Sequence, residues 1–430
     1  MRALIFVMLI AAVPAVGADD VDFDTWFTGE TLRVDLFRTG DAEGDVYSLD
    51  EIIVEGPWAG SRTKLIDTLN RGFFLYSVFD NESGKLIYSR GFSSVFGEWL
   101  TTDEAKQRKR SIGETARIPR PRKTVDLAVS KRDKHNNFVE FYRVTIDPNS
   151  HNNAEQGYSD AGFKVIDLHV PAEPRKVYDI LILPEGYTEE EAEKLRSDAE
   201  RMANVILETK PYSEMKDMIA VRTIEAYSRE SGIDQPREGI WKDTLFDARF
   251  NAFDSPRYVL TINNKAIADA AANAPYDAVA IMLNTERYGG GGIFNAYTTF
   301  AVDNEWAGYL LTHEGGHSFS GLGDEYYTSD VAYTDFYTAD AEPWEPNVTA
   351  LLDPENLKWK EFVTPGTPIP TPATDEYKKD VVGAFEGAGY MAKGLYRPAF
   401  DCKMISRANI DYCPVCMEAV RQMIRFYTEE

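Results

Sequence analysis

The sequence predicts two folded parts, a small all-β domain followed by an α/β domain. Three observations predict this division. Residues from about 22 to 147 contain short β-rich runs between turn-forming clusters, and they show no useful helical period. From about residue 165 strands and helices alternate, which is typical of a mostly parallel sheet flanked by helices. Between them, residues 148–162 are rich in Asn, Ser, Gly and Asp, as in a linker.

The first 18 residues have the features of an export signal. Arg2 provides a short basic region, residues 3–16 are apolar apart from Pro14, and residues 16–18 are small, as at a signal-peptidase site. The apolar run is too short for a stable membrane span, and no comparable run follows. We therefore expect the mature chain to begin near Asp19 and to be secreted, periplasmic or held at the cell surface.

Composition limits the classes of partner. The 430 residues carry a net charge of −24, which disfavours nucleic acids and anionic membranes. The hydrophobic content of 43% is typical of a globular protein. The sequence does not predict an oligomeric state.

Three cysteines lie near the C-terminus: Cys402, Cys413 and Cys416. In an exported protein this odd number allows one disulfide from Cys402 to Cys413 or Cys416, or three reduced and buried thiols. A zinc site made from these cysteines alone would lack a fourth ligand.

The first domain, residues 19–150, is predicted to be a β-sandwich. Its β-rich runs alternate with turn chemistry at residues 40–45 and 80–85. The predicted strands are residues 31–37, 72–79, 125–129 and 138–146. Residues 151–164 are the expected linker.

The second domain, residues 165–430, is predicted to hold a buried, mostly parallel sheet. Its expected strands are residues 177–183, 218–226, 258–262 and 276–283, and its expected helices are 189–208 and 263–273. Thr188 and Glu191 predict a capping box at the start of the first helix. Residues 328–380 are loop-like, and residues 419–430 predict a closing helix.

Four glycines, residues 289–292, precede a β-rich run at 293–301. They suggest a strand at the sheet edge that another chain can approach closely, with an ordinary flexible loop as the alternative. A phosphate-binding loop is disfavoured, because no Lys-Ser or Lys-Thr follows the glycines.

Residues 303–319 are predicted to form a helix that carries a metal site. His313 and His317 lie four residues apart and share one face, so two imidazoles can bind one ion, with Glu314 beside them as a potential base. Because the chain has only five His, the pattern His-acid-x-x-His arises by chance with a probability of roughly 0.01. The pattern indicates a zinc hydrolase; a structural zinc site is disfavoured, because such sites are usually closed and rich in Cys.

The third metal ligand is expected to be a carboxylate, because the other His residues, His135, His151 and His169, are expected to be surface groups. Gly321 and Gly323 can end the helix and turn Asp324 towards the metal, with Glu325 as a supporting residue. Glu342 and Glu345 are the alternatives, in a Pro-containing segment that is poor helix sequence.

Residues 313–326 read HEGGHSFSGLGDEY. This segment resembles the motif HExxHxxxGLxDEY of the secreted immunoglobulin-A peptidase family of metzincin-like zinc metallopeptidases, family sixty-four. Residues 183–188, 288–290, 385–390, 396–398, 402–404 and 413–416 also resemble this family, so the likeness covers about residues 165–430, and the β-rich domain resembles the family's N-terminal module.

The resemblance implies a metzincin-like fold, with Zn²⁺ on His313, His317 and Asp324 and with Glu314 as general base. It implies that Met404 is the methionine of the turn beneath the metal. It also suggests that a strand near residues 293–300 binds an extended peptide, with Gly290, Gly291, Ile293 and Tyr390 as substrate-binding candidates. The chain departs from the common pattern HExxHxxGxxH: its glycine comes one residue later, and position 323 is Gly in place of a third His.

The expected function is that of a secreted zinc metalloendopeptidase that hydrolyses peptide bonds of a protein or peptide substrate. The alternatives are a catalytically silent zinc-containing binding protein and a hydrolase of a cell-wall amide or glycan. The family name assigns no substrate, because substrate choice depends on the shape of the pocket.

Overall fold

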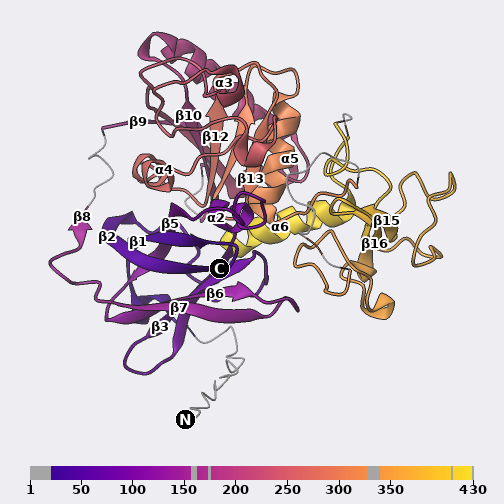
Figure 1. The fold of residues 1–430 in the computed structure, drawn as a ribbon, viewed down its shortest axis with the longest axis horizontal. Coiled ribbons are helices and arrows are strands. Elements are labelled where there is room, and N and C mark those ends of the chain that lie inside the picture. Colours follow the sequence, from indigo (N-terminus) through magenta and orange to yellow (C-terminus); the bar gives the residue numbers. More distant parts are fainter. Residues whose placement is uncertain are drawn as a thin grey trace.

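The computed structural model describes residues 21–155, 162–172, 176–327, 337, 339–407 and 410–428. The predicted signal peptide and part of the linker lie outside these residues. The chain forms an N-terminal β domain, an α/β domain above it and an irregular lobe at one side (Figure 1).

The N-terminal domain consists of two four-stranded sheets, with strand orders β5-β1-β2-β8 and β4-β3-β6-β7. The strands are β1 (Phe27–Asp41), β2 (Gly44–Pro57), β3 (Phe74–Asp80), β4 (Leu86–Phe92), β5 (Arg110–Pro121), β6 (Val125–Arg132), β7 (Phe138–Ile146) and β8 (Ala154–Glu155). Leu32 and Val34 of β1 share one apolar core with Val78 of β3 and Leu127 of β6, so the two sheets pack face to face. The four predicted strands and both predicted turns are present.

The α/β domain is built on a six-stranded sheet of order β13-β14-β12-β10-β11-β9. Its strands are β9 (Lys164–His169), β10 (Tyr178–Glu185), β11 (Ile219–Glu225), β12 (Ala278–Leu283), β13 (Gly290–Ile293) and β14 (Tyr297–Ala301). The inner strands are parallel, whereas β9 and β13 run antiparallel at the two edges. β10 and β12 are buried along their whole length, as predicted for a sheet covered on both faces.

Helices cover both faces of this sheet. Ile180 and Ile182 of β10 pack in one core with α3 (Ala192–Glu208), α5 (Ala307–Ser320) and α6 (Pro414–Thr428). Leu181 and Leu183 face the opposite way, into a core that includes α4 (Asn264–Ala271). The predicted capping box of Thr188 and Glu191 is present at a short 3-10 turn that leads into α3.

The strand predicted at residues 258–262 is wrong. Tyr258 and Leu260 make only isolated bridges, to Gly290 and Arg249 respectively. The chain arrives from an irregular turn in which Asn251, Phe253 and Asp254 have positive φ, so it crosses the sheet edge without forming a ladder.

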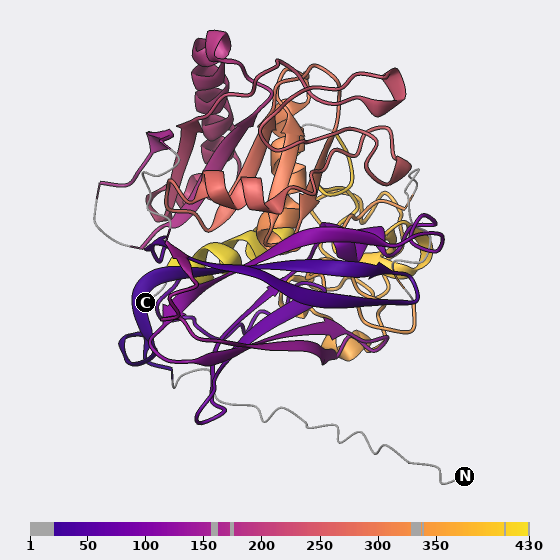
Figure 2. The same cartoon turned by 60° about the vertical axis from the view of Figure 1, so that its left-hand side comes forward.

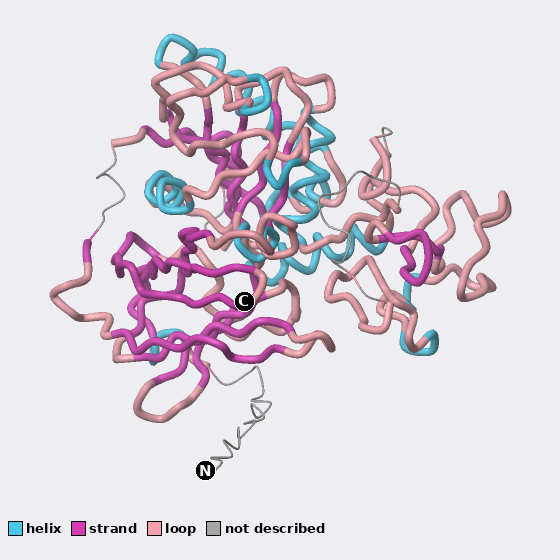
Figure 3. The backbone as a smooth tube through the Cα atoms, in the orientation of Figure 1, coloured by secondary structure: helices cyan, strands magenta, loops and turns pink. Residues whose placement is uncertain are grey.

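The described part of the C-terminal lobe has little regular structure, as predicted for residues 328–380, of which 328–336 and 338 lie outside the described residues. Its ladder among the described residues is the hairpin of β15 (Phe385–Ala388) and β16 (Met391–Arg397) (Figure 3). The closing helix begins earlier than predicted, at Pro414, because a proline fits the first turn of a helix. Within the described ranges, no helix is both long enough and apolar enough to cross a membrane.

The N-terminal domain lies directly against the α/β domain (Figure 2), and both an apolar core and polar contacts join the two. The buried guanidinium of Arg71 donates to the carbonyl oxygens of Ser320, at the end of α5, and Ala419, in α6, over 2.9 and 3.0 Å. Arg33 of β1 forms an ion pair of 2.7 Å with Asp269 of α4. The contact with Ser320 holds the end of α5, the helix that carries His313 and His317.

Candidate metal centre

Helix α5 ends at a turn that reverses the chain. Gly321 has φ +66°, its amide donates to the carbonyl oxygen of His317, and the amide of Leu322 donates to that of Gly316. This is a left-handed glycine cap, which a residue with a Cβ adopts only at a cost. The reversal brings Asp324 back over the face of α5 that carries His313 and His317, as predicted.

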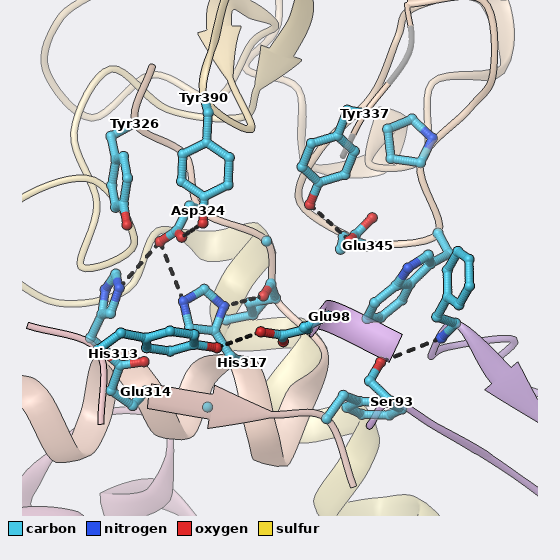
Figure 4. Close-up of a pocket in the computed structure, with 18 of the residues that line it drawn as sticks. Ser93, Glu98, His313, Glu314, His317, Asp324, Tyr326, Tyr337, Glu345 and Tyr390 are labelled. Carbon is cyan, nitrogen blue, oxygen red and sulfur yellow. Dashed lines mark hydrogen bonds and ion pairs between the residues drawn. The ribbon is translucent and has the colours of Figure 1, made fainter. Parts of the chain in front are cut away.

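Three potential ligand atoms converge there (Figure 4). Oδ1 of Asp324 lies 3.2 Å from Nε2 of His313 and 3.3 Å from Nε2 of His317. All three side chains lie largely out of solvent, and their ligand atoms fall within 4.8 Å of one another. These residues can therefore hold a single metal ion with an open position for a further ligand.

Hydrogen bonds fix which imidazole nitrogen faces the site. Nδ1 of His313 lies 3.0 Å from the carbonyl oxygen of Lys403, and Nδ1 of His317 lies 2.6 Å from that of Leu322. A carbonyl oxygen only accepts, so each Nδ1 carries a proton and each Nε2 is the ring nitrogen that faces Asp324.

The donor set fits a divalent cation. Oδ1 of Asp324 is buried and accepts no hydrogen bond, although two imidazole nitrogens lie beside it. Burial alone would raise the pKa of Asp324, but the adjacent imidazoles hold it well below its usual range, so the carboxylate is charged. Two imidazole nitrogens and an anionic oxygen that face one point need positive charge between them, which imidazole protons or a bound divalent cation can supply.

Several groups position Asp324. The hydroxyl of Tyr390 donates to its Oδ2, and the amide of Gly389 donates to its main-chain oxygen. Asn347 holds the preceding residue through two hydrogen bonds with the main chain of Gly323, of 2.8 and 2.9 Å. A Cβ at Gly323 would lie 3.0 Å from a side-chain methyl of Val348, so a His at this position, as in the commoner pattern, would crowd its neighbours.

The alternative carboxylates have other partners. Oε1 of Glu345 accepts a hydrogen bond from Tyr337, and Glu342 pairs with Lys358 at 3.1 Å. Of the three candidates, only Asp324 groups with the two imidazoles.

The ligand atoms open into a cavity of about 960 Å³ between the two domains and the C-terminal lobe. Glu314 and Glu98 both line it. Glu98 comes from the N-terminal domain, in the short helix α2 (Val95–Trp99), and accepts a hydrogen bond of 2.6 Å from Tyr258. Burial raises the pKa of Glu98 to about 7.

The glycine strand lies along the wall of this cavity. Gly290 and Gly292 line it, and a Cβ at Gly292 would meet the backbone of Glu314 at 2.3 Å, so the strand packs directly on α5. Gly291 and Ile293 are not among the lining residues, and Ile293 is fully buried in the core. Tyr390 lines the cavity, where it contacts Asp324.

The prediction that a strand near residues 293–300 binds a peptide along its edge is wrong. Residues of β14 are buried between β13 and β12, so they have no open edge. The edge belongs to β13. The amide of Gly290 donates to Arg257 and its carbonyl accepts from Val259, so the outward edge is paired at that residue. Gly292, two residues further, has its amide and carbonyl on the same outward side.

Met404 lies under α5, as the resemblance implied. It is fully buried, and its Sδ would lie 2.8 Å from a Cβ at Gly316, between the two His of the helix. Its main-chain oxygen accepts a hydrogen bond of 3.0 Å from the amide of Glu325.

Sequence reasoning did not select four residues that shape the site. They are Glu98 and Arg257 in the cavity wall, and Asn347 and Lys403, which hold the ligand segments. No sequence spacing could have found Glu98, because it lies 215 residues before His313 in another domain. Lys403 contributes only its backbone carbonyl oxygen, a group that every residue type has, so the sequence cannot indicate this role.

Comparisons with known proteins show the family to which the chain belongs. A family model described as "IgA Peptidase M64" matches residues 166–381 and 373–424, which is more than half of the chain. A second model, "Peptidase M64 N-terminus", matches residues 22–143. The chain therefore belongs to the IgA peptidase M64 family, a family of metallopeptidases, and carries both its peptidase domain and its N-terminal domain.

Other comparisons add little. No curated protein matches the chain. A solved structure titled "Crystal Structure of a Thermostable Esterase" is 12% identical, covers 59% of this chain and 66% of that chain, slightly under two thirds of its length, and has a TM-score of 0.15. At that score it carries no argument about fold or function.

Proposed function

We propose that the protein is a secreted zinc metalloendopeptidase with a metzincin-like catalytic domain, and that it acts at the centre formed by His313, His317 and Asp324. The observation that carries the proposal is the convergence of both Nε2 atoms on the buried Oδ1 of Asp324, at 3.2 and 3.3 Å, in the wall of a large cavity. Export rests on the predicted signal at residues 1–18 alone.

Zinc is the expected ion, since two imidazoles and one carboxylate are a common ligand set of catalytic zinc sites. When bound there, Zn²⁺ would polarise the scissile carbonyl and lower the pKa of a water molecule towards roughly 7. His313 and His317 hold their lone pairs towards the ion, and Asp324 supplies one negative charge.

Glu314 is the proposed general base. It lines the cavity one residue from His313, and burial raises the pKa of its carboxyl group, which brings that pKa closer to neutral pH. A raised pKa suits a group that removes a proton from the attacking water and then delivers it to the leaving amine nitrogen. The carboxylate ends the cycle in the state in which it began.

A peptide substrate fits the cavity in an extended conformation. The outward amide and carbonyl of Gly292 can add a substrate strand to the edge of β13 next to the metal centre, which is a common mode of peptide binding. Strand addition reads main-chain groups, so the selection of substrate side chains falls to the cavity walls, to which the N-terminal domain contributes Glu98.

The test is digestion of a proteome-derived peptide library by the mature, zinc-loaded protein, with and without a chelator. We expect cuts within peptides that disappear with chelator and with His317→Ala, and return when zinc is restored to the wild type. An intact library would favour a silent zinc-binding protein. Turnover of a cell-wall amide or glycan in place of peptides would favour the other alternative.

A further inference from the structure

A second group of potential metal ligands lies in the protein interior. Cys402, Cys413 and Cys416 are fully buried and form no disulfide. The carboxylate of Glu325 joins them, and one ligand atom from each of the four residues lies within 4.8 Å of the others. The fourth ligand that the cysteines alone lack is thus supplied by a residue that lies far away in sequence.

The distances suit tetrahedral coordination by thiolates. Sγ of Cys402 lies 3.8 Å from Sγ of Cys416. A tetrahedral zinc ion with Zn–S bonds of about 2.3 Å places two sulfur atoms roughly 3.8 Å apart. Oε1 of Glu325 lies 3.0 Å from Sγ of Cys416, so the carboxylate has to move back by roughly half an ångström to bind the same ion.

The local backbone supports thiolates. The amide of Cys413 points to Sγ of Cys402 at 3.2 Å, and the amide of Cys416 points to Sγ of Cys413 at 3.5 Å. Such N–H donors stabilise the charged form of sulfur. Cys413 and Cys416 flank Pro414 and Val415 at the start of α6, so the first turn of the helix holds their side chains together.

An unpaired atom points to a missing partner. Glu325 is 0% exposed, and its Oε1 accepts from Asn347 at 2.8 Å, yet its Oε2 is buried without a hydrogen bond. A buried carboxylate with an unpaired oxygen is costly unless a cation or donor is present. Three thiolates and one carboxylate around Zn²⁺ carry the same net charge as a four-cysteine zinc site, which proteins form readily.

We propose that Cys402, Cys413, Cys416 and Glu325 hold a second, structural Zn²⁺ or similar thiophilic ion. All four side chains are buried and none lines the large cavity, so this site is closed. The proposal of this second site does not rest on the proposed peptidase function at His313, His317 and Asp324.

The second ion would stabilise the segments that position the ligands of the first site. Glu325 directly follows Asp324, and Cys402 directly precedes Lys403, whose carbonyl oxygen accepts from His313. The amide of Glu325 also bonds to the oxygen of Met404. One ion that binds Glu325 and Cys402 therefore ties together the two segments that position a ligand aspartate and a ligand histidine.

The test combines metal content with absorption of the Co²⁺-substituted protein. We expect a second equivalent of metal per chain and a strong thiolate-to-cobalt charge-transfer band. The chain has three cysteines, all in this group, so such a band has no other source. His317→Ala should keep the band although it removes a ligand of the first site, whereas Cys416→Ser should lose both the band and one equivalent of metal.

The wild-type protein alone can overturn the proposal. A single equivalent of metal with no charge-transfer band would contradict it, whether or not the variants fold. So would mass spectrometry after denaturation and alkylation in chelator, if only one thiol reacted, because that result means a disulfide between two of the cysteines. Because none of these readouts uses peptide cleavage, they leave the proposed peptidase activity to its own test.

Discussion

The carbonyl oxygen of Lys403 lies 3.0 Å from Nδ1 of His313, although the two residues are 90 positions apart in the chain. This contact sets the tautomer of His313 and directs its Nε2 to Asp324. The metal centre is therefore made by three segments: helix α5, the reversal after it, and the turn around Met404. A change in any one of these segments should alter the affinity of the centre for its metal ion.

Loss of the Tyr390 hydroxyl should weaken the metal centre. This hydroxyl donates to Oδ2 of Asp324, so Tyr390→Phe removes one of the partners that hold the orientation of the carboxylate. We expect metal affinity to fall about 10–100-fold, as is typical of groups that support a metal ligand. Titration against a competing chelator measures it. Tyr396→Phe in β16 is the control, since its side chain is only partly buried and does not line the cavity; an equal loss in both variants would contradict the role of Tyr390.

Gly321→Ala should destabilise the end of α5. The residue has φ +66°, and a Cβ would lie 3.0 Å from Trp344 and 3.2 Å from Phe294. We expect the free energy of unfolding to fall by about 1–2 kcal/mol, measured by denaturant titration, together with weaker metal binding because Asp324 shifts. Gly113→Ala in β5 is the control, because a Cβ there would meet no atom within 4 Å and its φ is not positive. Equal stability of both variants would show that the left-handed cap is not needed.

The buried carboxyl group of Glu98 should make stability depend on pH. Its pKa is raised from 4.5 to about 7 in the folded protein, so the folded state binds its proton more tightly than the unfolded state does. The stability gained from this group is complete below about pH 4.5 and is lost as the pH rises through about 7. Glu98→Gln cannot titrate, and its side-chain oxygen can still accept from Tyr258.

We therefore expect the wild type to lose stability relative to Glu98→Gln between about pH 5 and about pH 8, by on the order of 1–3 kcal/mol. Paired chemical denaturation curves across this range, with metal present in both samples, measure the difference. A constant difference across the range would show that Glu98 titrates in the folded protein as it does in the unfolded one.

Much of the fold could be predicted from the sequence, because local chemistry determines it. The alternating pattern of residues 138–146 predicts β7 with its observed bounds, and the capping box at Thr188 marks the start of the segment that becomes α3. Residues 258–262 misled the prediction, since a β-rich composition cannot show that positive φ angles upstream leave the segment without a ladder.

The residues of the site also fall into those that local sequence predicts and those that only tertiary packing brings in. His313, Glu314, His317 and Asp324 lie within 12 residues, and a helix followed by a glycine reversal brings them together by local geometry alone. By contrast, Glu98 reaches the cavity only because the N-terminal domain docks on the α/β domain, and Glu325 reaches the cysteines only through tertiary packing. The open strand edge was predicted at residues 293–300, but the structure has it at Gly292 of β13. The later residues form β14, which pairs with β13 on one side and β12 on the other.

The most direct test of the central claim is Glu314→Gln, with metal content and peptide cleavage measured on the same sample. We expect the variant to bind as much zinc as the wild type and to cleave the peptide library at least about 10²–10⁴-fold more slowly, because the general base is lost while the three ligands remain. Glu305→Gln, an exposed residue just before α5, should cleave at the wild-type rate. Cleavage by Glu314→Gln at the wild-type rate would contradict the role of Glu314 as general base.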